Sequence, residues 1–406
     1  MHVVAFEINR NFLLFLRVDA PDRSCYVPSQ MAQSVYVLAG EHSGDAHAAG
    51  LLSALREQIP DLEILGAGGP LMKKLAGPDF NDWVEDAAMM GLWEVLKNYG
   101  WFRRQFATML DEISKAKPSL LLLVDYPGYN LRFAKAARKV FPDMPIIYYI
   151  SPQVWAWNRG RIPHMAALLD EMLCLFPFEQ GIFSAAGLKT THVGHPLVDE
   201  LESARIFVER ENDLVGLFPG SREREVARLF PDMLRSAKLL LQEGRRLRFE
   251  APAASSVLFE LMRSLVHSAG MADHVQVTVG DSHGLMQRAW CGVIASGTAT
   301  LEAAYFVMPY CLVYRVAWPT YCLGRLLVRI KYIGLVNILA DRQVVRELIQ
   351  GEAEPAQINQ ELHLLLDHEQ YRKTMIDSLL ATAAQLGGRG AHRRAAAAVA
   401  KWLEGT

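Results

Sequence analysis

The chain has 406 residues, of which 51% are hydrophobic and 21% are charged, so a disordered chain is excluded and two domains are expected. Lys and Arg number 42 against 44 Asp and Glu, and this formal net charge of -2 argues against a general nucleic-acid binder. Mean hydropathy is slightly positive, at +0.09, yet no apolar run approaches the roughly 20 residues that a membrane-spanning helix needs.

The first thirty residues lack the layout of a signal peptide, because charged residues surround their brief apolar patch. Met31 stands just before a strong strand pattern, so we interpret residues 1–33 as a leader or an upstream-start extension. The five cysteines form no close pair and lie in apolar contexts, which predicts reduced, buried thiols in a cytosolic protein.

Short apolar runs alternate with amphipathic stretches in the first half, which predicts an α/β domain with a parallel sheet over 34–197. A helix is expected over 46–58, and a longer one over 92–115 with a break near Gly100. The expected strands, in chain order, are 35–39, 62–66, 120–124, 146–150, 172–176 and 191–193.

The same alternation restarts after a polar linker near 195–212 and predicts a second Rossmann-like domain over 198–378. A helix is expected over 225–241, and residues 379–406 are predicted to form a helical C-terminal tail. The expected strands of this half are 214–218, 248–251, 275–279, 292–295 and 311–314.

Ligands of parallel α/β sheets bind at the carboxyl ends of strands, so the strand-to-helix turns are the expected sites of chemistry. The first turn combines two glycines with Glu41, Ser43 and Asp45, and a capped turn without further role is slightly favoured there. The second turn begins with Asp125 and contains Asn130. Partial burial would make Asp125 an effective general base, whereas its alternative role is a helix cap.

A third turn, 151–157, carries two tryptophans, of which Trp155 either lines a sugar-binding wall or pins the loop to the core. In the fourth turn, Ser221 and Arg222 precede a helix whose free N–H groups and dipole attract phosphate. Because Arg222, Arg224 and Arg228 oppose that dipole, we expect an anionic ligand at this turn.

The fifth turn, which contains Ser296 and Gly297, offers the hydroxyls of Thr298 and Thr300 to a diphosphate, and Glu302 to two ribose hydroxyls. A capping-box start of the helix explains Thr298 and Glu302 as well. Two phosphate-type turns predict a nucleoside diphosphate in this half, although no Walker loop is present. The histidine spacing predicts no metal site.

Two apolar segments account for the positive hydropathy. The second, 318–333, interleaves cations with apolar residues, and this favours an ordinary buried helix. The first segment, 87–104, places Met, Trp and other apolar residues beside arginines, as an interfacial helix that touches lipid does. An ordinary buried helix is an equal alternative for it. Its lipid-facing candidates are Met89, Met90, Leu92, Trp93, Trp101 and Phe102.

Taken together, these turns resemble the lipid A disaccharide synthase family of bacterial glycosyltransferases. The resemblance covers roughly residues 35–380 in the same order, and its 90–96 and 149–157 segments are the most specific. It implies the GT-B fold, an α/β architecture with a cleft between two Rossmann-like domains. The matching segments are 39–45, 90–96, 125–130, 149–157, 177–179, 194–196, 219–222 and 296–302.

The resemblance implies transfer of 2,3-diacylglucosamine from UDP-2,3-diacylglucosamine to 2,3-diacylglucosamine 1-phosphate, with a β-1,6 linkage formed by inversion and UDP released. Asp125 would be the base for the acceptor hydroxyl, and Arg222 would stabilise the charge developing on UDP without metal or cofactor. Glu302 would hold the ribose, and Asn337 would lie near the donor, although Val336 replaces the proline usual in the family.

The remaining site residues divide between the two substrates. Those assigned to the diphosphate region of the donor are Ser221, Gly297, Thr298 and Thr300. Those assigned to the acceptor side are Glu41, Ser43, Asp45, Asn130 and Trp155.

The expected location is the cytoplasmic face of the inner membrane, as a peripheral protein that binds no nucleic acid. A homo-oligomer is left open by the long helical tail. One alternative function is another GT-B enzyme on UDP-GlcNAc-type donors, an N-acetylglucosaminyltransferase or an epimerase. The other is a non-catalytic binding module for nucleotide sugars or a membrane surface.

Overall fold

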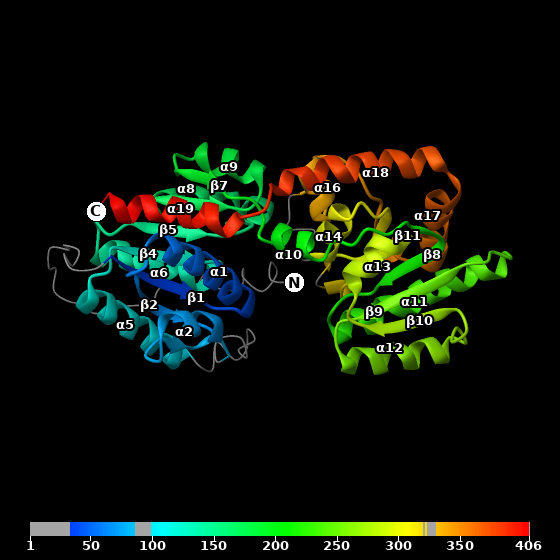
Figure 1. Cartoon of the computed structure of the whole chain (residues 1–406), viewed down its shortest axis with the longest axis horizontal. Helices are drawn as coiled ribbons and strands as arrows, with labels where there is room; N and C mark the ends of the chain where they lie inside the picture. The colour runs from blue at the N-terminus through cyan, green and yellow to red at the C-terminus, as the bar shows by residue number, and fades with distance from the viewer. Residues whose placement is uncertain (1–32, 86–98, 320, 323–329, 406) are drawn as a thin grey trace. The chain divides into compact units, whose positions relative to one another are not determined.

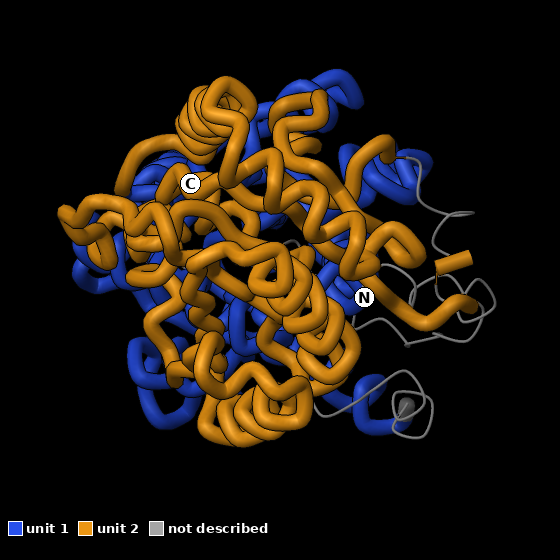
Figure 2. The backbone as a smooth tube through the Cα atoms, turned by 90° about the vertical axis from the view of Figure 1, so that its right-hand side faces the viewer, with its two compact units in different colours: residues 1–196, 323–329, 390–406 blue, residues 197–322, 330–389 orange. Residues whose placement is uncertain are grey.

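The computed structural model of the chain describes residues 33–85, 99–319, 321–322 and 330–405. The chain divides into two compact units, shown in different colours in Figure 2. The described part of the first unit is 33–85, 99–196 and 390–405, and that of the second is 197–319, 321–322 and 330–389.

The first unit is built on a seven-stranded parallel sheet with the strand order β3-β2-β1-β4-β5-β6-β7 (Figure 1). All five residues of its central strand β4 are fully buried, because helices cover both faces of the sheet. The strands are β1 (Ser34–Ala39), β2 (Glu63–Gly68), β3 (Asn81–Asp82), β4 (Leu120–Val124), β5 (Ile146–Tyr149), β6 (Glu171–Cys174) and β7 (Thr190–His192).

Helices follow the strands of the first unit. Of the long helix expected over 92–115, the structure describes α5, which runs through Gly100 without interruption, while 92–98 lie outside the described residues. The α-helices are α1 (His42–Gln58), α2 (Pro70–Ala76), α5 (Tyr99–Ala116), α6 (Pro127–Val140), α7 (Val154–Trp157), α8 (Ile162–Ala166), α9 (Pro177–Ser184) and α19 (Ala391–Glu404).

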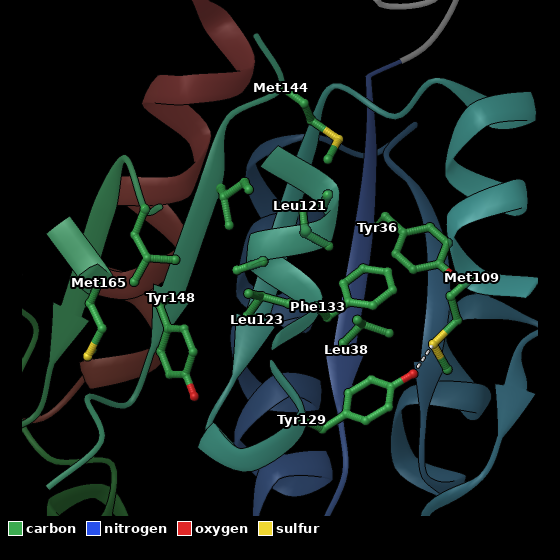
Figure 3. Packing of buried hydrophobic residues seen from close by; sticks show 14 of the residues in the cluster. Tyr36, Leu38, Met109, Leu121, Leu123, Tyr129, Phe133, Met144, Tyr148 and Met165 are labelled. Carbon is green, nitrogen blue, oxygen red and sulfur yellow. Dashed lines mark hydrogen bonds between the residues drawn. The ribbon is translucent and has the colours of Figure 1, made fainter. Parts of the chain in front are cut away.

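The core of the first unit lies between α6, α5 and the centre of the sheet. Leu38 of β1, Leu121 of β4 and Phe133 of α6 are fully buried and pack in one cluster (Figure 3). In the same view, the hydroxyl of Tyr129 donates a hydrogen bond to the sulfur of Met109 at 3.2 Å, so α6 is joined to α5 by a polar contact inside an apolar core.

The second unit has a six-stranded parallel sheet with the order β10-β9-β8-β11-β12-β13. Its edge strand β13 and the edge strand β3 of the first unit are short, and neither was predicted from the sequence. The strands are β8 (Glu211–Phe218), β9 (Arg248–Ala253), β10 (Val275–Val279), β11 (Ala289–Ala295), β12 (Tyr310–Tyr314) and β13 (Glu347–Ile349).

The helices of the second unit cover both faces of its sheet (Figure 1). The predicted helical tail 379–406 comprises the end of α18, which stops at Ala383, and a further α-helix that begins at Ala391. The α-helices are α10 (Leu197–Ser203), α11 (Glu223–Gln242), α12 (Ser256–Ser268), α13 (Ser282–Arg288), α14 (Ala299–Tyr305), α16 (Leu335–Ala340), α17 (Pro355–Asp367) and α18 (Glu369–Ala383).

The last helix, α19, belongs to the first unit and packs against α1. The indole N–H of Trp402 donates to the buried carboxylate of Glu171 on β6 at 2.6 Å. The side-chain amide of Gln33, just before β1, donates to the carbonyl of Leu403 at 3.1 Å. The two ends of the described chain are therefore fastened to the same sheet.

The predicted fold class is confirmed, because both units are parallel-sheet, Rossmann-like α/β structures and the chain ends in a helix. Within the described ranges, none of the helices combines the length and the apolar composition that crossing a membrane requires. Cys174, Cys291 and Cys311 are buried free thiols as expected, whereas Cys322 is exposed.

Candidate active site

The order of the strands reverses once in each sheet, between β1 and β4 in the first and between β8 and β11 in the second. Ligands of open α/β sheets bind outside the carboxyl ends of the strands at such a reversal. The turns that follow these four strands are four of the five turns selected from the sequence, and they contain Gly40, Asp125, Ser221 and Gly297.

At the reversal of the first sheet, the turn after β1 and the turn after β4 are in direct contact. A Cβ atom added to Gly40 would lie 2.2 Å from Cδ1 of Tyr126, so only glycine fits beneath this ring. The contact also brings Glu41, the residue after Gly40, within electrostatic range of Asp125. Two carboxylates therefore meet at the switch point of the sheet.

The backbone at Asp125 adopts a conformation that L-residues rarely take. The φ angles of Asp125 and Tyr126 are 46° and 47°, both in the left-handed region. The carbonyl of Asp125 accepts hydrogen bonds from the hydroxyl of Tyr148 on β5 and from the side-chain amide of Asn130, the latter at 2.8 Å. These two donors hold the strained turn in place.

Burial raises the pKa of Asp125 from 3.8 to about 6, with a further upward contribution from the charge of Glu41 and an opposing one from the backbone N–H of Tyr126. A carboxylate with this pKa is still ionised near neutral pH, and it is a stronger base than an exposed aspartate. The cap interpretation of Asp125 is not supported, because no side-chain capping bond is made at the start of α6.

Asn130 and Asp45 were expected on the acceptor side, and the structure shows both side chains buried and hydrogen-bonded to the backbone. Asn130 is fully buried, and its amide also donates to the carbonyl of Val124 at 3.1 Å. Asp45 is buried and accepts three backbone N–H bonds at 3.0 Å each, which cap α2 rather than its own helix. Glu41 and Ser43 remain accessible at the start of α1.

Trp155 is also part of the scaffold. It is 4% exposed, and its indole N–H donates to Oε1 of Glu179 at 3.0 Å. The second oxygen of Glu179 accepts the backbone N–H of Phe176 at 3.1 Å, and burial raises the pKa of this carboxyl to about 7. The pinning interpretation is therefore the correct one for Trp155, while Trp157 is only half-buried.

Of the six lipid-facing candidates, the structure describes Trp101 and Phe102. Both are half-buried and pack on the core of the first unit, where the ring of Trp101 stacks on Trp83 at 6.0 Å. Trp83 in turn meets the ring of Tyr126 edge-on at 6.4 Å, so this aromatic cluster borders the Asp125 turn. The other four candidates, Met89, Met90, Leu92 and Trp93, lie outside the described residues.

In the second unit, Ser221 and Arg222 are exposed at the start of α11, after Gly220 with a φ of 109°. The side chain of Arg222 pairs with Glu225 at 2.9 Å. Glu223 and Glu225 lie in the first turn of the helix and offset part of the positive charge, so the charge argument for an anion at this turn is weaker than the sequence suggested. The exposure and position of Arg222 at the switch point still fit an anionic ligand.

The turn after β11 separates residues that can reach a ligand from residues that cannot. Gly297 and Thr298 are exposed, and Thr298 makes no capping bond, so the capping-box alternative is wrong. Thr300 is fully buried and donates its hydroxyl to the carbonyl of Gly297 at 2.7 Å, so it shapes the turn instead of contacting a diphosphate. Glu302 is 17% exposed on its side chain, with Oε2 at 3.3 Å from Nε2 of His283.

Asn337 does not face a ligand either. It is fully buried, and its amide donates to the carbonyl of Val345 at 2.9 Å and to Glu347 at 2.8 Å. Its oxygen accepts the backbone N–H groups of Val344 and Val345 at 2.7 and 3.0 Å. With both ends of the amide bonded to protein, the expected donor contact is corrected to a structural one.

Tyr148 and His283 were missed in the sequence, and Glu179 was named there only within the matching segment 177–179. Tyr148 lies on a strand of apolar and aromatic residues, which hides the role of its hydroxyl. Glu179 stands after Pro177 at the third position of α9, and this helix-start pattern was its available signal. His283 has no motif around it, because its partner Glu302 is distant in the sequence. Among the residues that the structure describes, no group of three or more His, Cys, Asp or Glu is arranged to hold a metal ion.

Two parallel-sheet, Rossmann-like units, each with one reversal of strand order, define a GT-B type of fold. The solved structure of a glycosyltransferase from Rickettsia africae matches with a TM-score of 0.52 at 11% identity, covering 93% of this chain and 99% of that one. A putative UDP-N-acetylglucosamine 2-epimerase from Listeria monocytogenes matches with a TM-score of 0.59 at 12% identity, covering 92% and 97%.

Sequence comparison narrows this class to one family. The family model described as lipid-A-disaccharide synthetase matches residues 35–401. A relative named lipid-A-disaccharide synthase, from Trichlorobacter lovleyi, is 37% identical over 378 residues, which are 91% of this chain and 97% of the relative. The chain belongs to the lipid-A-disaccharide synthetase family.

Proposed function

We propose that the chain forms the lipid A disaccharide by transferring 2,3-diacylglucosamine from its UDP derivative to 2,3-diacylglucosamine 1-phosphate. Membership of the family supports the reaction. The observation on the chain's own residues that carries the proposal is the Asp125 turn, where burial and Glu41 raise the pKa of the carboxyl to about 6. An acceptor hydroxyl needs a base of this kind as it attacks.

The proposed reaction is a single displacement. The acceptor's 6-hydroxyl oxygen forms a bond to the anomeric carbon of the donor, and its proton passes to the carboxylate of Asp125. The bond from that carbon to the diphosphate breaks, and its electron pair leaves with UDP. Attack from the face opposite the leaving group inverts the carbon, so the protein forms no covalent sugar intermediate.

Charge that develops on the leaving diphosphate needs preorganised donors. The exposed guanidinium of Arg222 and the N-terminus of the long helix α11 supply them, with the hydroxyls of Ser221 and Thr298 beside them. Glu302 accepts from the ribose hydroxyls. These assignments require neither a metal nor a cofactor, and they exclude Thr300 and Asn337, whose polar atoms are bonded within the protein.

We also propose that the protein works at the cytoplasmic face of the inner membrane, because both substrates carry acyl chains. The half-buried aromatic rings of Trp101 and Phe102 border the Asp125 turn and support an apolar route to it. Binding to vesicles of anionic phospholipid, compared between wild type and Trp93→Ser, tests the membrane part. If this variant keeps the wild-type melting temperature and binds the vesicles as wild type does, the proposed membrane binding through Trp93 is refuted.

The decisive assay measures UDP release from UDP-2,3-diacylglucosamine with and without 2,3-diacylglucosamine 1-phosphate. Acceptor-dependent release is expected for the wild type, and a loss of roughly 100- to 10,000-fold in kcat for Asp125→Asn, the range for removing a general base. Ser53→Ala, at an exposed position of α1 in the same unit, is a control for nonspecific damage. UDP release that does not depend on the acceptor would indicate hydrolysis of the donor by water and would refute the proposed transfer, and an epimerase would give no net UDP release.

A further inference from the structure

The carboxylate of Glu302 is held by a histidine from another helix. Nε2 of His283, on α13, lies 3.3 Å from Oε2 of Glu302, on α14. The two side chains are 22% and 17% exposed, so the pair is partly shielded from water yet reachable from outside. The imidazole also packs on the ring of Phe306, with 5.6 Å between the centroids, and this contact limits its rotation.

This pair leaves Glu302 with one occupied oxygen and one available oxygen. Within the part of the chain that the structure describes, Oε2 faces His283 and Oε1 has no hydrogen-bond donor from the protein. A carboxylate that binds a pair of adjacent hydroxyls must be ionised and must present its oxygens in a fixed direction. A donor on Oε2 fixes that direction, as partners behind a ligating group do elsewhere.

Three carboxylates act on His283. The hydrogen bond to Glu302 on α14 is the largest cause that raises the pKa of the imidazole, burial opposes it, and the charges of Glu302, Glu200 on α10 and Asp281 at the start of α13 raise it further. Arg288 lies 3.9 Å from Asp281 and moderates that one charge. The histidine is therefore protonated over a wider pH range than a free one.

We propose that His283 is a positioning residue for nucleoside recognition: it holds Glu302 in the orientation that accepts the ribose hydroxyls, most firmly while the imidazole is protonated. When His283 loses its proton, only the tautomer with hydrogen on Nε2 still donates to Glu302, and the charge assistance is lost. The preference for a ribose over a deoxyribose should therefore weaken as pH rises through the pKa of His283. This inference rests on the proposed role of Glu302 in ribose binding.

The test compares the affinities of the full-length protein for UDP and for 2′-deoxy-UDP by titration calorimetry between pH 5.5 and 8.5. Both ligands carry the same titrating phosphate, so the ratio of the two affinities cancels its contribution. We expect the wild type to prefer UDP by about tenfold or more at low pH. The preference should shrink by about three- to tenfold at high pH, as charge assistance to Glu302 is lost.

Three variants test whether His283 positions Glu302 or only stabilises the fold. His283→Ala should reduce the ratio to about two- to threefold at all pH values, with the donor KM raised and kcat nearly unchanged. His283→Gln keeps an N–H donor without a titrating group, so it should restore much of the ratio and remove its pH dependence. His267→Gln, at an exposed position of α12, should behave as wild type.

The possible outcomes distinguish failure of the positioning role of His283 from failure of the proposed ribose-binding role of Glu302. If Glu302→Gln leaves the ratio unchanged, the ribose role of Glu302 is wrong, and the positioning role fails with it. If Glu302→Gln lowers the ratio but both His283 variants keep the wild-type ratio and pH profile, only the positioning role is overturned. Should His283→Ala not fold, a pH dependence that persists in His283→Gln still refutes the proposal.

Discussion

Replacing Glu41 with glutamine should shift the acid limb of the activity profile to lower pH. The pKa of Asp125 is raised from 3.8 to about 6, first by burial and then by the charge of Glu41. At ~1.36 kcal/mol per pKa unit, the whole difference is worth about 3 kcal/mol. Because burial is the larger cause, we expect Glu41 to supply about 1 kcal/mol, which moves the pKa of Asp125 down by about 0.7.

That displacement is measurable in the pH dependence of kcat/KM. A base with a pKa of about 6 is ~10% ionised at pH 5, whereas one with a pKa of about 5.3 is ~33% ionised. Relative to its own plateau, Glu41→Gln should therefore be about three times as active as wild type at pH 5. The plateau itself should be somewhat lower, because a weaker base accepts the acceptor's proton less readily.

The assay is initial-rate UDP release at subsaturating acceptor from pH 4.5 to 8. Asp61→Asn removes an exposed carboxylate of the same unit and serves as the matched control, with an unchanged profile. An acid limb of Glu41→Gln that stays where wild type has it, or that moves to higher pH, would refute the electrostatic coupling of Glu41 to Asp125.

Three further predictions concern stability and packing. A carboxyl whose pKa is raised in the folded state destabilises the fold as pH rises from ~4 to ~6, because it must ionise while buried. In denaturant titrations, Asp125→Asn should therefore be more stable than wild type by up to ~3 kcal/mol at pH 8 and equal to it below pH ~4. Gly40→Ala should lower kcat/KM by about tenfold or more, since its Cβ collides with the ring of Tyr126; the wild-type rate in Gly40→Ala would contradict this placement. Asn337→Ala should lower the free energy of unfolding by about 2–5 kcal/mol, because buried N–H groups lose their acceptor, while UDP affinity measured on the folded variant stays constant.

The sequence predicted the framework of the site well, for a physical reason. A strand such as β4, buried on both faces, must be aliphatic throughout, and glycines mark the turns where backbone or rings approach closely. Both signals are local. They located the turns at both switch points, including those that begin at Asp125 and Pro219, before any strand order was known.

The roles of single polar residues could not be read in the same way. Asp45, Thr300 and Asn337 look like site residues because they stand in or near the right turns, yet all three are buried and bonded to backbone. What decides their role is a neighbour brought by the fold, such as the start of α2 for Asp45. The same holds for His283 on α13, because its partner Glu302 lies on α14, the helix that follows the next strand.

The placement of α19 has a consequence for the order in which the protein is made. The strands of the first unit precede the second unit in the sequence, but the helix that packs on α1 and is bonded to Glu171 follows the second unit. The whole second unit is synthesised in between, so it folds as an insertion within an unfinished partner. Removing Trp402 and the residues after it is therefore expected to destabilise the first unit, not the second.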